Sequence, residues 1–599
     1  MKMILAIRLM ANRCGKCLLV AIPLVWSCSC EPGYDLVVRG GTIYDGSGRP
    51  GYIGDVAVRG DRIAYVGPHA PGDAAREIDA AGRAVSPGFI NMLSWSNESL
   101  LQDGRGQGEL RQGVTLEVMG EGDSMGPLTP LMKEELKAQQ GDIQYPVEWT
   151  TLDEYLRTLE RKGVSLNVAS YIGAATARMN LLGEADVDPT PQQLDAMRAV
   201  VKRAIEDGAL GVASALIYAP GTFAETDELV ALAQTAGRCG GIYATHMRSE
   251  GRRLLEAIDE TIEISRRSGT PAEIYHLKAA GQDNWPKLEQ AIAHIEAARR
   301  DGLRISTEMY AYPAGGTGLD ASMPTWVQAG GNEAWFARLR DPAIRKRVAA
   351  EMRAPDAGWE NIMQMSGGPE HVLLAALRNP ALKPLIGKTL AEVAKERGVT
   401  AEEAAMDLVV EDQSRVGAIY FLISEDNIRR EMALPYMTFG SDGTAVSAEG
   451  VFLKSNLHPR GYGNFARVFA RYVRDEKVLT VEEAVRRMTA QSAAVLGLHD
   501  RGQLKEGYYA DIVVFDPATI QDHATYAAPH QYSTGVSNVI VNGAEALRDG
   551  LPTDARPGRV VRGRGWTGWD NGGCRASPAA WDWPMWGPAD WGGTAKASD

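Results

Sequence analysis

Eight short apolar runs alternate with amphipathic, helix-like stretches through the middle of this 599-residue chain. Several of the runs lie roughly 30 residues apart, which suits the strand–helix units of a parallel (β/α)8 barrel. The runs occupy residues 84–93, 115–120, 167–173, 211–216, 242–247, 272–277, 304–312 and 436–443. We therefore predict an α/β protein whose central body is a TIM-type barrel made from these eight strands.

Both ends of the chain carry a different pattern, in which apolar and polar residues alternate between glycine-containing pairs. The segments DLVVRGGTIYDGSG and DVAVRGDRIAYVG show this pattern near the start, and YYADIVVFD and VSNVIVNGAEALRDG show it near the end. Period-two alternation with such punctuation predicts β-hairpins. We expect the two ends, 34–84 and 501–561, to form one composite β-sandwich.

The gap between the seventh and eighth runs is much longer than the others and contains its own helical pattern. Long structureless connections are uncommon in compact domains, so we predict an inserted lid or subdomain there. The predicted organisation is a signal peptide (1–30), the first part of the β-sandwich (34–84), barrel strands 1–7 (85–312), the insertion (313–435), barrel strand 8 with the last helices (436–500), the second part of the β-sandwich (501–561) and a tryptophan-rich tail (562–599). The tail is expected to be an arm packed through its tryptophans, or a surface for carbohydrate or a partner.

The first 30 residues are typical of an export signal. Basic residues precede the apolar run CLLVAIPLVW (17–26), which is too short to span a bilayer as a stable helix. The sequence SCSC that follows resembles a bacterial lipoprotein cleavage box with Cys28 as the acylated residue, although Trp26 is bulky for that box. We expect an exported protein, either periplasmic or anchored to a membrane through a lipid on Cys28, with a misassigned start codon as the alternative.

The charge balance argues against nucleic acid as the main partner. The chain has 63 Lys and Arg against 76 Asp and Glu, a net charge of −13, and no long basic run follows the first 16 residues. Phosphate binding requires clustered positive charge, so a small molecule is the expected partner. Four of the six cysteines lie in the first 30 residues, which leaves Cys239 and Cys574 in the body and predicts no disulfide framework.

Three residues that can carry chemistry stand at the ends of predicted strands. His246 and His276 end the fifth and sixth runs, and Asp442 ends the eighth. Because barrel active sites form at the carboxyl ends of the strands, we expect all three at one mouth. Imidazole is a natural zinc ligand, and a carboxylate beside it can act as general base on a water molecule. The alternatives are hydrogen-bonded rim histidines and a turn aspartate.

Long, ordered segments of the chain resemble the amidohydrolase superfamily, and most closely its N-acyl-D-amino-acid deacylase (D-aminoacylase) branch. The segments are DLVVRGGTIYDGSG, SPGFI, RQGVTLEVMGEG, IYAPGTFAETDELVAL, YATHMRSEG, YHLKAAG, FGSDG, HPRGYGNFARVFARYV and LKEGYYADIVVFDPATI. The resemblance implies a zinc-bearing barrel with a composite β-sandwich. It also implies that His246 and His276 are metal ligands, that Asp442 is the catalytic aspartate, and that Lys278 holds the substrate or polarises its carbonyl.

The chain departs from the family pattern at the other metal ligands. The usual His-x-His pair after the first strand is replaced by Leu93 and Trp95, and the loop cysteine of D-aminoacylases aligns with Gly122. We expect Glu121 to supply the third ligand, with Asp123 and Glu117 as alternatives. Two histidines and a glutamate form an established zinc site, so one zinc per chain is expected, while N and O ligands also accept iron, manganese or cobalt.

These parts predict a hydrolase that cleaves the amide bond of N-acyl amino acids, with the D configuration expected. Tyr218 or Lys278 is the expected oxyanion partner. The substrate carboxylate requires a cationic clamp, for which Arg248, Lys278 and Arg460 are available, although ordinary salt-bridged arginines are an equal reading of Arg248 and Arg460.

Several alternatives stay open at this point. His458 either binds substrate or packs a loop, and Tyr310 and Tyr312 either line the pocket or belong to the core. The alternative functions are a metal-free binding protein, which has lost catalysis, and a hydrolase of cyclic amides, dipeptides or related bonds.

Overall fold

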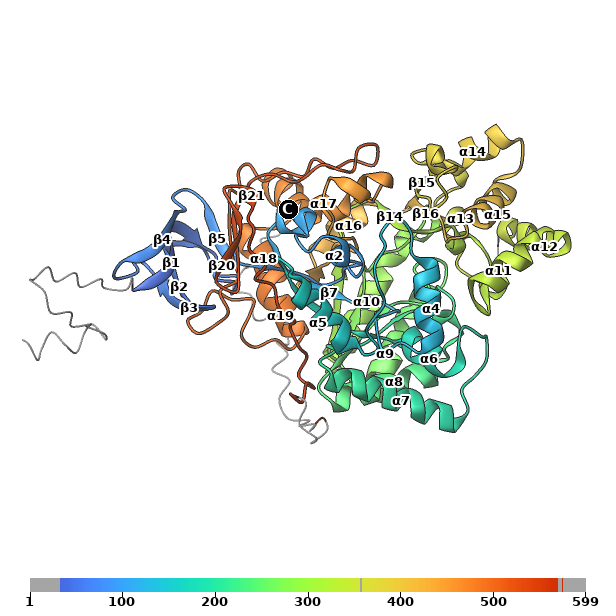
Figure 1. Cartoon of the computed structure of the whole chain (residues 1–599), viewed down its shortest axis with the longest axis horizontal. Helices are drawn as coiled ribbons and strands as arrows, with labels where there is room; N and C mark the ends of the chain where they lie inside the picture. Colours follow the sequence, from blue (N-terminus) through green and yellow to red (C-terminus); the bar gives the residue numbers. More distant parts are fainter. Residues whose placement is uncertain (1–32, 356–357, 569–573, 575–599) are drawn as a thin grey trace, which may run out of the picture.

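The computed structural model describes residues 33–355, 358–568 and 574 of the chain (Figure 1). Nine short strands form the central barrel, all of them parallel to their neighbours. They are β6 (Phe89–Asn91), β7 (Val114–Met119), β8 (Asn167–Ser170), β9 (Ile172–Gly173), β10 (Gly211–Ala215), β11 (Ile242–His246), β12 (Ala272–Ile274), β13 (Ile305–Met309) and β17 (Met437–Phe439). Each predicted run overlaps at least one of these strands, with β7 beginning one residue before its run, and β8 and β9 both fall in the third run.

The barrel closes between its first and last strands. The backbone N–H of Met92 donates to the carbonyl of Phe439 over 3.2 Å, and Ser94 and Gly443 form a parallel bridge just beyond the strand ends. The predicted fold class, a barrel with extra sheet units at both ends of the chain, is confirmed.

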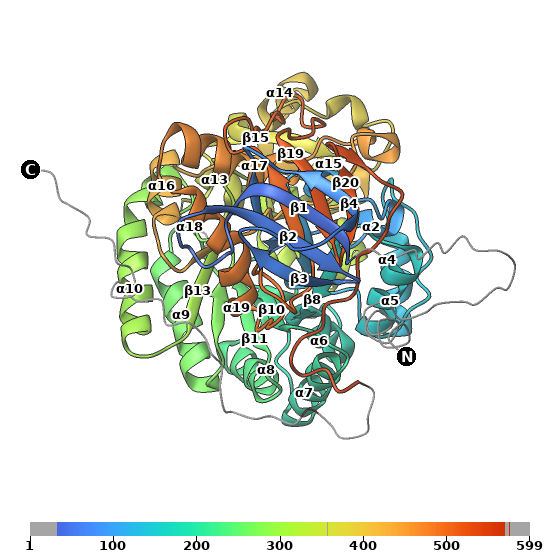
Figure 2. The same cartoon turned by 90° about the vertical axis from the view of Figure 1, so that its left-hand side faces the viewer.

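Helices surround the barrel (Figure 2). Those between β6 and β13 are α2 (Ser99–Gln102), α3 (Gln107–Leu110), α4 (Pro130–Gln139), α5 (Leu152–Lys162), α6 (Ala174–Leu182), α7 (Pro191–Glu206), α8 (Thr226–Arg238), α9 (Leu254–Ser268) and α10 (Leu288–Arg300). Helix α7 shows why they form: Thr190 caps its first turn in a capping box with Gln193, and Pro191 fits the first helical position. Its buried side chains, including Met197, Val201 and Ile205, recur at helical spacing and face inward.

One nine-stranded sheet joins the two ends of the chain. Its strands are β1 (Tyr34–Ile43), β2 (Tyr52–Arg59), β3 (Arg62–Gly67), β4 (Ala74–Asp79), β5 (Ala84–Pro87), β18 (Ile512–Phe515), β19 (Val536–Val541), β20 (Ala544–Arg548) and β21 (Leu551–Pro552). Strand β5 pairs antiparallel with β18, and Val38, Ile512 and Val514 share one buried core. Gly88 lies between β5 and β6, at a place where a Cβ would come within 2.1 Å of Oγ1 of Thr115. The first predicted run therefore divides at this glycine: β5 belongs to the sheet and β6 belongs to the barrel.

The long segment between β13 and β17 folds as a separate layer, which lies at the far end of the molecule from β1–β4 (Figure 1). It contains a three-stranded antiparallel sheet ordered β14 (Ala314–Gly318), β16 (Gly417–Phe421) and β15 (Val372–Ala376). Its helices are α11 (Gly331–Arg340), α12 (Pro342–Arg353), α13 (Ile362–Met365), α14 (Leu390–Arg397) and α15 (Ala401–Asp412). The chain then returns through α16 (Glu425–Met432), and the helices after β17 are α17 (Arg460–Arg467), α18 (Val481–Arg486) and α19 (Ser492–Val495).

The end of the described chain crosses the amino-terminal ends of the barrel strands. Val561 donates to the carbonyl of Val168 on β8, and Gly563 donates to that of Gly208 ahead of β10. A disulfide then links Cys239, just before β11, to Cys574. The sequence predicted no disulfide framework, and it did not predict this cross-link, which is the one disulfide among the described residues.

The predicted signal peptide, Cys28 and most of the tryptophan-rich tail lie outside the described residues. None of the described helices is long and apolar enough to cross a membrane.

Candidate metal and active site

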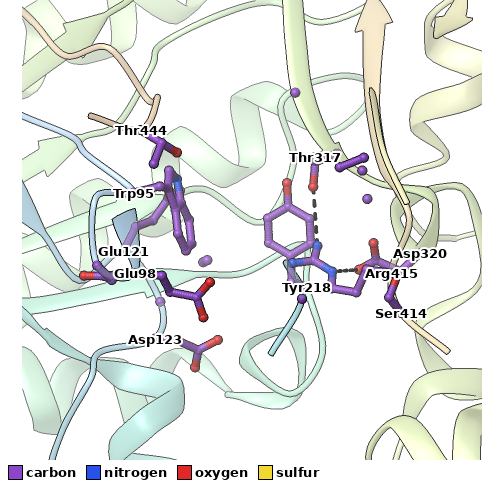
Figure 3. Close-up of a pocket in the computed structure, with 18 of the residues that line it drawn as sticks. Trp95, Glu98, Glu121, Asp123, Tyr218, Thr317, Asp320, Ser414, Arg415 and Thr444 are labelled. Carbon is purple, nitrogen blue, oxygen red and sulfur yellow. Dashed lines mark hydrogen bonds and ion pairs between the residues drawn. The ribbon is translucent and has the colours of Figure 1, made fainter. Parts of the chain in front are cut away.

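A cavity of about 890 Å³ opens at the carboxyl ends of the barrel strands. The loops after β6, β7, β10, β11, β12 and β17 line one part of it, and β14, β16 and the loop before β16 line much of the opposite wall. Trp95 and Tyr218 stand on opposite sides of its open part, with Glu98 and Asp123 between them at one edge (Figure 3). The insertion therefore forms a wall of the cavity that the barrel opens.

Two histidines and a glutamate converge at the base of this cavity. Oε1 of Glu121 lies 3.1 Å from Nδ1 of His246 and 3.2 Å from Nε2 of His276, and all three side chains are buried. Ligands around a tetrahedral zinc lie roughly 3.4 Å apart when each bond is about 2.1 Å. The spacing and the chemistry of these donors fit a divalent metal, and they form the one group of potential metal ligands found among the described residues.

The two alternatives for the third ligand do not join this group. Glu117 lies inside the barrel, where it accepts a hydrogen bond of 2.9 Å from Asn91 Nδ2. Asp123 extends into the cavity instead (Figure 3). Of the three acidic candidates, Glu121 is the residue that the fold brings to the histidines.

Glycines and strained backbone create this geometry. Gly120 and Gly122 flank Glu121 at φ +100° and +67°, and a Cβ on Gly120 would lie 2.5 Å from the carbonyl oxygen of Tyr171. His276 has a φ of +32°, which a non-glycine residue rarely adopts, and its backbone N–H donates to Glu308 over 2.6 Å. Positions of this kind persist where surrounding contacts enforce them, and they concentrate at functional sites.

Glu250 is a site residue that the sequence analysis missed. Its Oε1 lies 2.9 Å from Nδ1 of His276 and 3.6 Å from Nε2 of His246, on the side of each ring that faces away from Glu121. Metal-binding histidines usually direct their second nitrogen at such a carboxylate, which fixes the ring. The available signal was its position four residues after His246.

Carboxylates dominate the electrostatics of this group. Burial alone would raise the pKa of Glu121, but hydrogen bonds from His246 and His276 lower it to about 2. Burial and Lys278 lower the pKa of His276, yet Glu250 and Glu121 outweigh them and raise it to about 10. The position therefore favours positive charge, as a cation site requires.

Asp442 stands at the same mouth, directly after β17. Its Oδ1 accepts a hydrogen bond of 3.0 Å from the indole N–H of Trp95, and its Oδ2 lies 2.9 Å from Nη1 of Arg460. Burial raises the pKa of Asp442 although the charges of Arg460 and His276 oppose the rise. Its φ is +46°, a second left-handed residue at this site.

Lys278 and Tyr218 both border the cavity. Nζ of Lys278 lies 2.5 Å from Glu250 and 2.8 Å from Nδ1 of His276, so the ammonium is anchored beside the metal-ligand group. The ring of Tyr218 packs edge-on against His246 with 5.2 Å between centroids. Arg415, which the sequence did not single out, lies over that ring at 5.0 Å and is held by Asp320 over 2.8 Å (Figure 3).

Of the two arginines predicted to bind the substrate carboxylate, only Arg460 borders the cavity. Arg460 borders the cavity, with its guanidinium 4.6 Å above the ring of Tyr310. Arg248 does not border it: the side chain makes a two-point ion pair with Glu260 on α9 and donates to the carbonyls of Thr222 and Ala224. Arg248 therefore fits the alternative that the sequence left open, an ordinary salt-bridged arginine, because its donors hold a loop to a helix.

Of the remaining aromatic and histidine candidates, some border the cavity and others pack in the interior behind it. Tyr310 borders the cavity, whereas Tyr312 is buried behind it against His458, with ring centroids 5.4 Å apart. His458 touches the cavity wall, but its two nitrogens bond backbone groups of Ala314 and Arg460, as expected of a loop-packing residue.

Comparisons with known proteins bear on this site as a whole. The model of the Amidohydrolase family matches residues 76–546. A D-aminoacylase of Alcaligenes xylosoxydans xylosoxydans is 34% identical, over 88% of this chain and 97% of its own, and an N-acyl-D-glutamate deacylase of the same organism is 33% identical, over 88% and 96%. A solved N-acyl-D-glutamate deacylase from Bordetella bronchiseptica, complexed with zinc and a phosphonate mimic of the tetrahedral intermediate, superposes with a TM-score of 0.72 at 30% identity, over 88% of this chain and 99% of its own. The matched residues include every ligand candidate described above.

Proposed function

This chain belongs to the amidohydrolase family, and on that premise we propose that it is a metal-dependent hydrolase that cleaves the amide bond of N-acyl-D-amino acids. The observation that carries the proposal is the convergence of Glu121, His246 and His276 on one cavity that Asp442 also borders. The names of the deacylases to which the chain is 33–34% identical support the substrate class.

One divalent metal, zinc in the first instance, is held by the two histidines and Glu121. Bound there, it supplies Lewis acidity, which polarises a carbonyl and lowers the pKa of a water molecule. Glu250 fixes the ring of His276 from behind, 2.9 Å from Nδ1, and its charge lies 3.6 Å from Nε2 of His246. The zinc named in the related crystal structure supports the choice of metal.

Asp442 is the proton carrier of the proposed reaction. It removes a proton from the attacking water, and it delivers that proton to the amine nitrogen as the carbon–nitrogen bond breaks. Tyr218, beside His246, is the candidate hydrogen-bond donor to the carbonyl oxygen. The retained ligand set and base together argue against the alternative of a metal-free binding protein.

The free carboxylate of the substrate is bound by cations that border the cavity. Arg460 and Lys278 both do so, and both lie near the ring of Tyr310, at 4.6 and 5.7 Å. A guanidinium offers a planar, two-point match to a carboxylate, which makes Arg460 the principal clamp.

We also propose that the protein is exported, as the basic and apolar character of its first 30 residues predicts. The disulfide between Cys239 and Cys574 supports this location, because such bonds persist in oxidising compartments. Lipidation at Cys28 remains part of the same proposal and is tested by the mass of the mature amino terminus.

The test of the enzymatic proposal is metal content measured together with amine release. The full chain, purified without chelator, is expected to carry about one zinc and to release amine from N-acetyl-D-amino acids faster than from the L enantiomers. His276→Ala is expected to lose both metal and turnover. Asp442→Asn is expected to keep the metal and lose about 10²–10⁴-fold in kcat. A protein that binds no metal after reconstitution and releases no amine would overturn the proposal in favour of a binding protein.

A further inference from the structure

Trp95 connects the loops after the first and last strands of the barrel, next to Asp442, the candidate general base. Its backbone N–H donates to the carbonyl of Gly443 over 2.7 Å, and its indole N–H donates to Oδ1 of Asp442 over 3.0 Å. The loop after β6 is therefore hydrogen-bonded to the loop after β17 through both the main chain and the side chain of Trp95. The backbone N–H of Asp442 in turn donates to Leu93 over 2.9 Å.

The Asp442 carboxylate is held at both of its oxygens. Trp95 donates to Oδ1, and Arg460 lies 2.9 Å from Oδ2. A hydrogen bond on one oxygen and an ion pair on the other restrict the rotation of the carboxylate about its last bond, and the hydrogen bond from Trp95 is the directional contact of the two. Each oxygen of a carboxylate has room for a further hydrogen bond, so Asp442 can still accept a proton from a third group.

An indole suits this task because it donates and cannot accept. Trp95 offers one N–H and no lone pair, so it cannot compete with Asp442 for the proton that the base must receive. Trp95 as a whole is 38% exposed, and its ring faces the open cavity across from Tyr218 (Figure 3). It therefore contributes two separable features, a hydrogen bond to the base and an apolar wall for the bound molecule.

We propose that Trp95 is the positioning residue of Asp442: its indole N–H sets the orientation of the carboxylate that moves the proton, while its ring forms one wall of the substrate cavity. This inference rests on the proposed function for the role of Asp442. Holding a reacting group within a fraction of an ångström of its productive position is worth large factors in rate.

Two substitutions separate the hydrogen bond from the wall. Trp95→Phe keeps an aromatic face and removes the donor, so kcat is expected to fall about 10- to 100-fold while KM changes less than about threefold. Trp95→Ala removes both features, and KM is expected to rise as well. Metal content is expected to stay as in the wild type. Trp326→Phe is the matched control, because it removes an indole hydrogen bond of 2.8 Å to the carboxylate of Glu351, and neither residue borders the cavity.

A double-mutant cycle tests whether Trp95 acts through Asp442. In the Asp442→Asn background the base is already absent, so adding Trp95→Phe is expected to lower the residual rate less than about twofold. A fall as large as in the wild-type background would overturn the inference, as would a wild-type kcat in Trp95→Phe.

A readout without turnover separates this inference from the proposed function. In protein labelled with ¹⁵N-tryptophan, the indole resonance that disappears in Trp95→Phe is expected to move upfield in Asp442→Asn, because a charge-assisted hydrogen bond becomes a neutral one. The Trp326 resonance is expected to stay in place. An unmoved Trp95 resonance would overturn the inference, whereas absent wild-type turnover with a moved resonance would overturn only the proposed chemistry.

Discussion

Glu117 and Glu109 form a pair of buried carboxyls inside the barrel, bridged by one amide. Nδ2 of Asn91 lies 2.9 Å from Oε2 of Glu117 and 3.5 Å from Oε1 of Glu109, and all three side chains are buried. Burial raises the pKa of Glu117 to about 7. Burial and the charge of Glu117 likewise raise the pKa of Glu109. Two carboxylates this close in a low-dielectric interior cannot both ionise without cost.

The pair predicts how stability depends on pH. The folded-state pKa of Glu117, about 7, exceeds the ordinary value of 4.5, so the native state binds more protons between these values and the free energy of unfolding falls as pH rises through them. Glu117→Gln removes a cost on the order of 3 kcal/mol that is present above pH 7 and absent below about pH 4.5.

Calorimetry at two pH values checks this expectation. The gain in Tm of Glu117→Gln over the wild type should be larger at pH 8 than at pH 5, and metal content should not change. Equal gains at both pH values would show that Glu117 titrates normally. Loss of metal would mean that Glu117, and not Glu121, is the third ligand.

At the scale of elements, the sequence predicted the strands that carry chemistry because buried parallel strands are apolar runs with polar residues at their ends. His246 and His276 were found in this way. The division of the run 84–93 was not predictable, because β5 pairs with β18 and the pairing partner lies more than 400 residues away. Glu250 and the contact between Trp95 and Asp442 depend on loop geometry, which hydrophobic periodicity does not encode.

Helix α15 ends in a strained turn that leads directly to the cavity wall. Gln413, its C-cap, has φ +52° and ψ +38°, and Arg415 follows two residues later. Left-handed backbone costs roughly 1–2 kcal/mol for a residue with a Cβ and almost nothing for glycine. This turn sets where the Arg415 guanidinium enters the cavity.

Gln413→Gly is therefore expected to stabilise the insertion, whereas Gln413→Ala should not. The predicted difference between the two variants is about 1 kcal/mol in the free energy of unfolding, in favour of glycine. Urea titration of both variants beside the wild type measures it. Alanine performing as well as glycine would show that the turn carries no strain from its Cβ.

At the scale of the whole molecule, catalysis and stabilisation occupy opposite ends of the barrel. The cavity lies at the carboxyl ends of the strands, and the strap formed by residues 558–567 crosses the amino-terminal ends. Backbone hydrogen bonds tie the strap to Val164, Val168 and Gly208, and Cys574 is joined to Cys239 beyond it. This division follows the general rule for the fold, in which the lower face serves stability.

The cross-link between Cys239 and Cys574 is therefore expected to stabilise the protein without affecting turnover. It closes a loop of 335 residues, and restricting so long a loop in the unfolded chain is worth about 2–5 kcal/mol. Cys574→Ser should lower Tm while leaving kcat, KM and metal content within about twofold of the wild type, since no strand end that bears a ligand candidate touches the cross-link. Cys239→Ser is the matched control: both single variants and the double variant should share one Tm, because each removes the same bond. If the three values differed, or if kcat fell together with Tm, the strap would be acting on the cavity through the barrel, and the two ends of the molecule would not be independent.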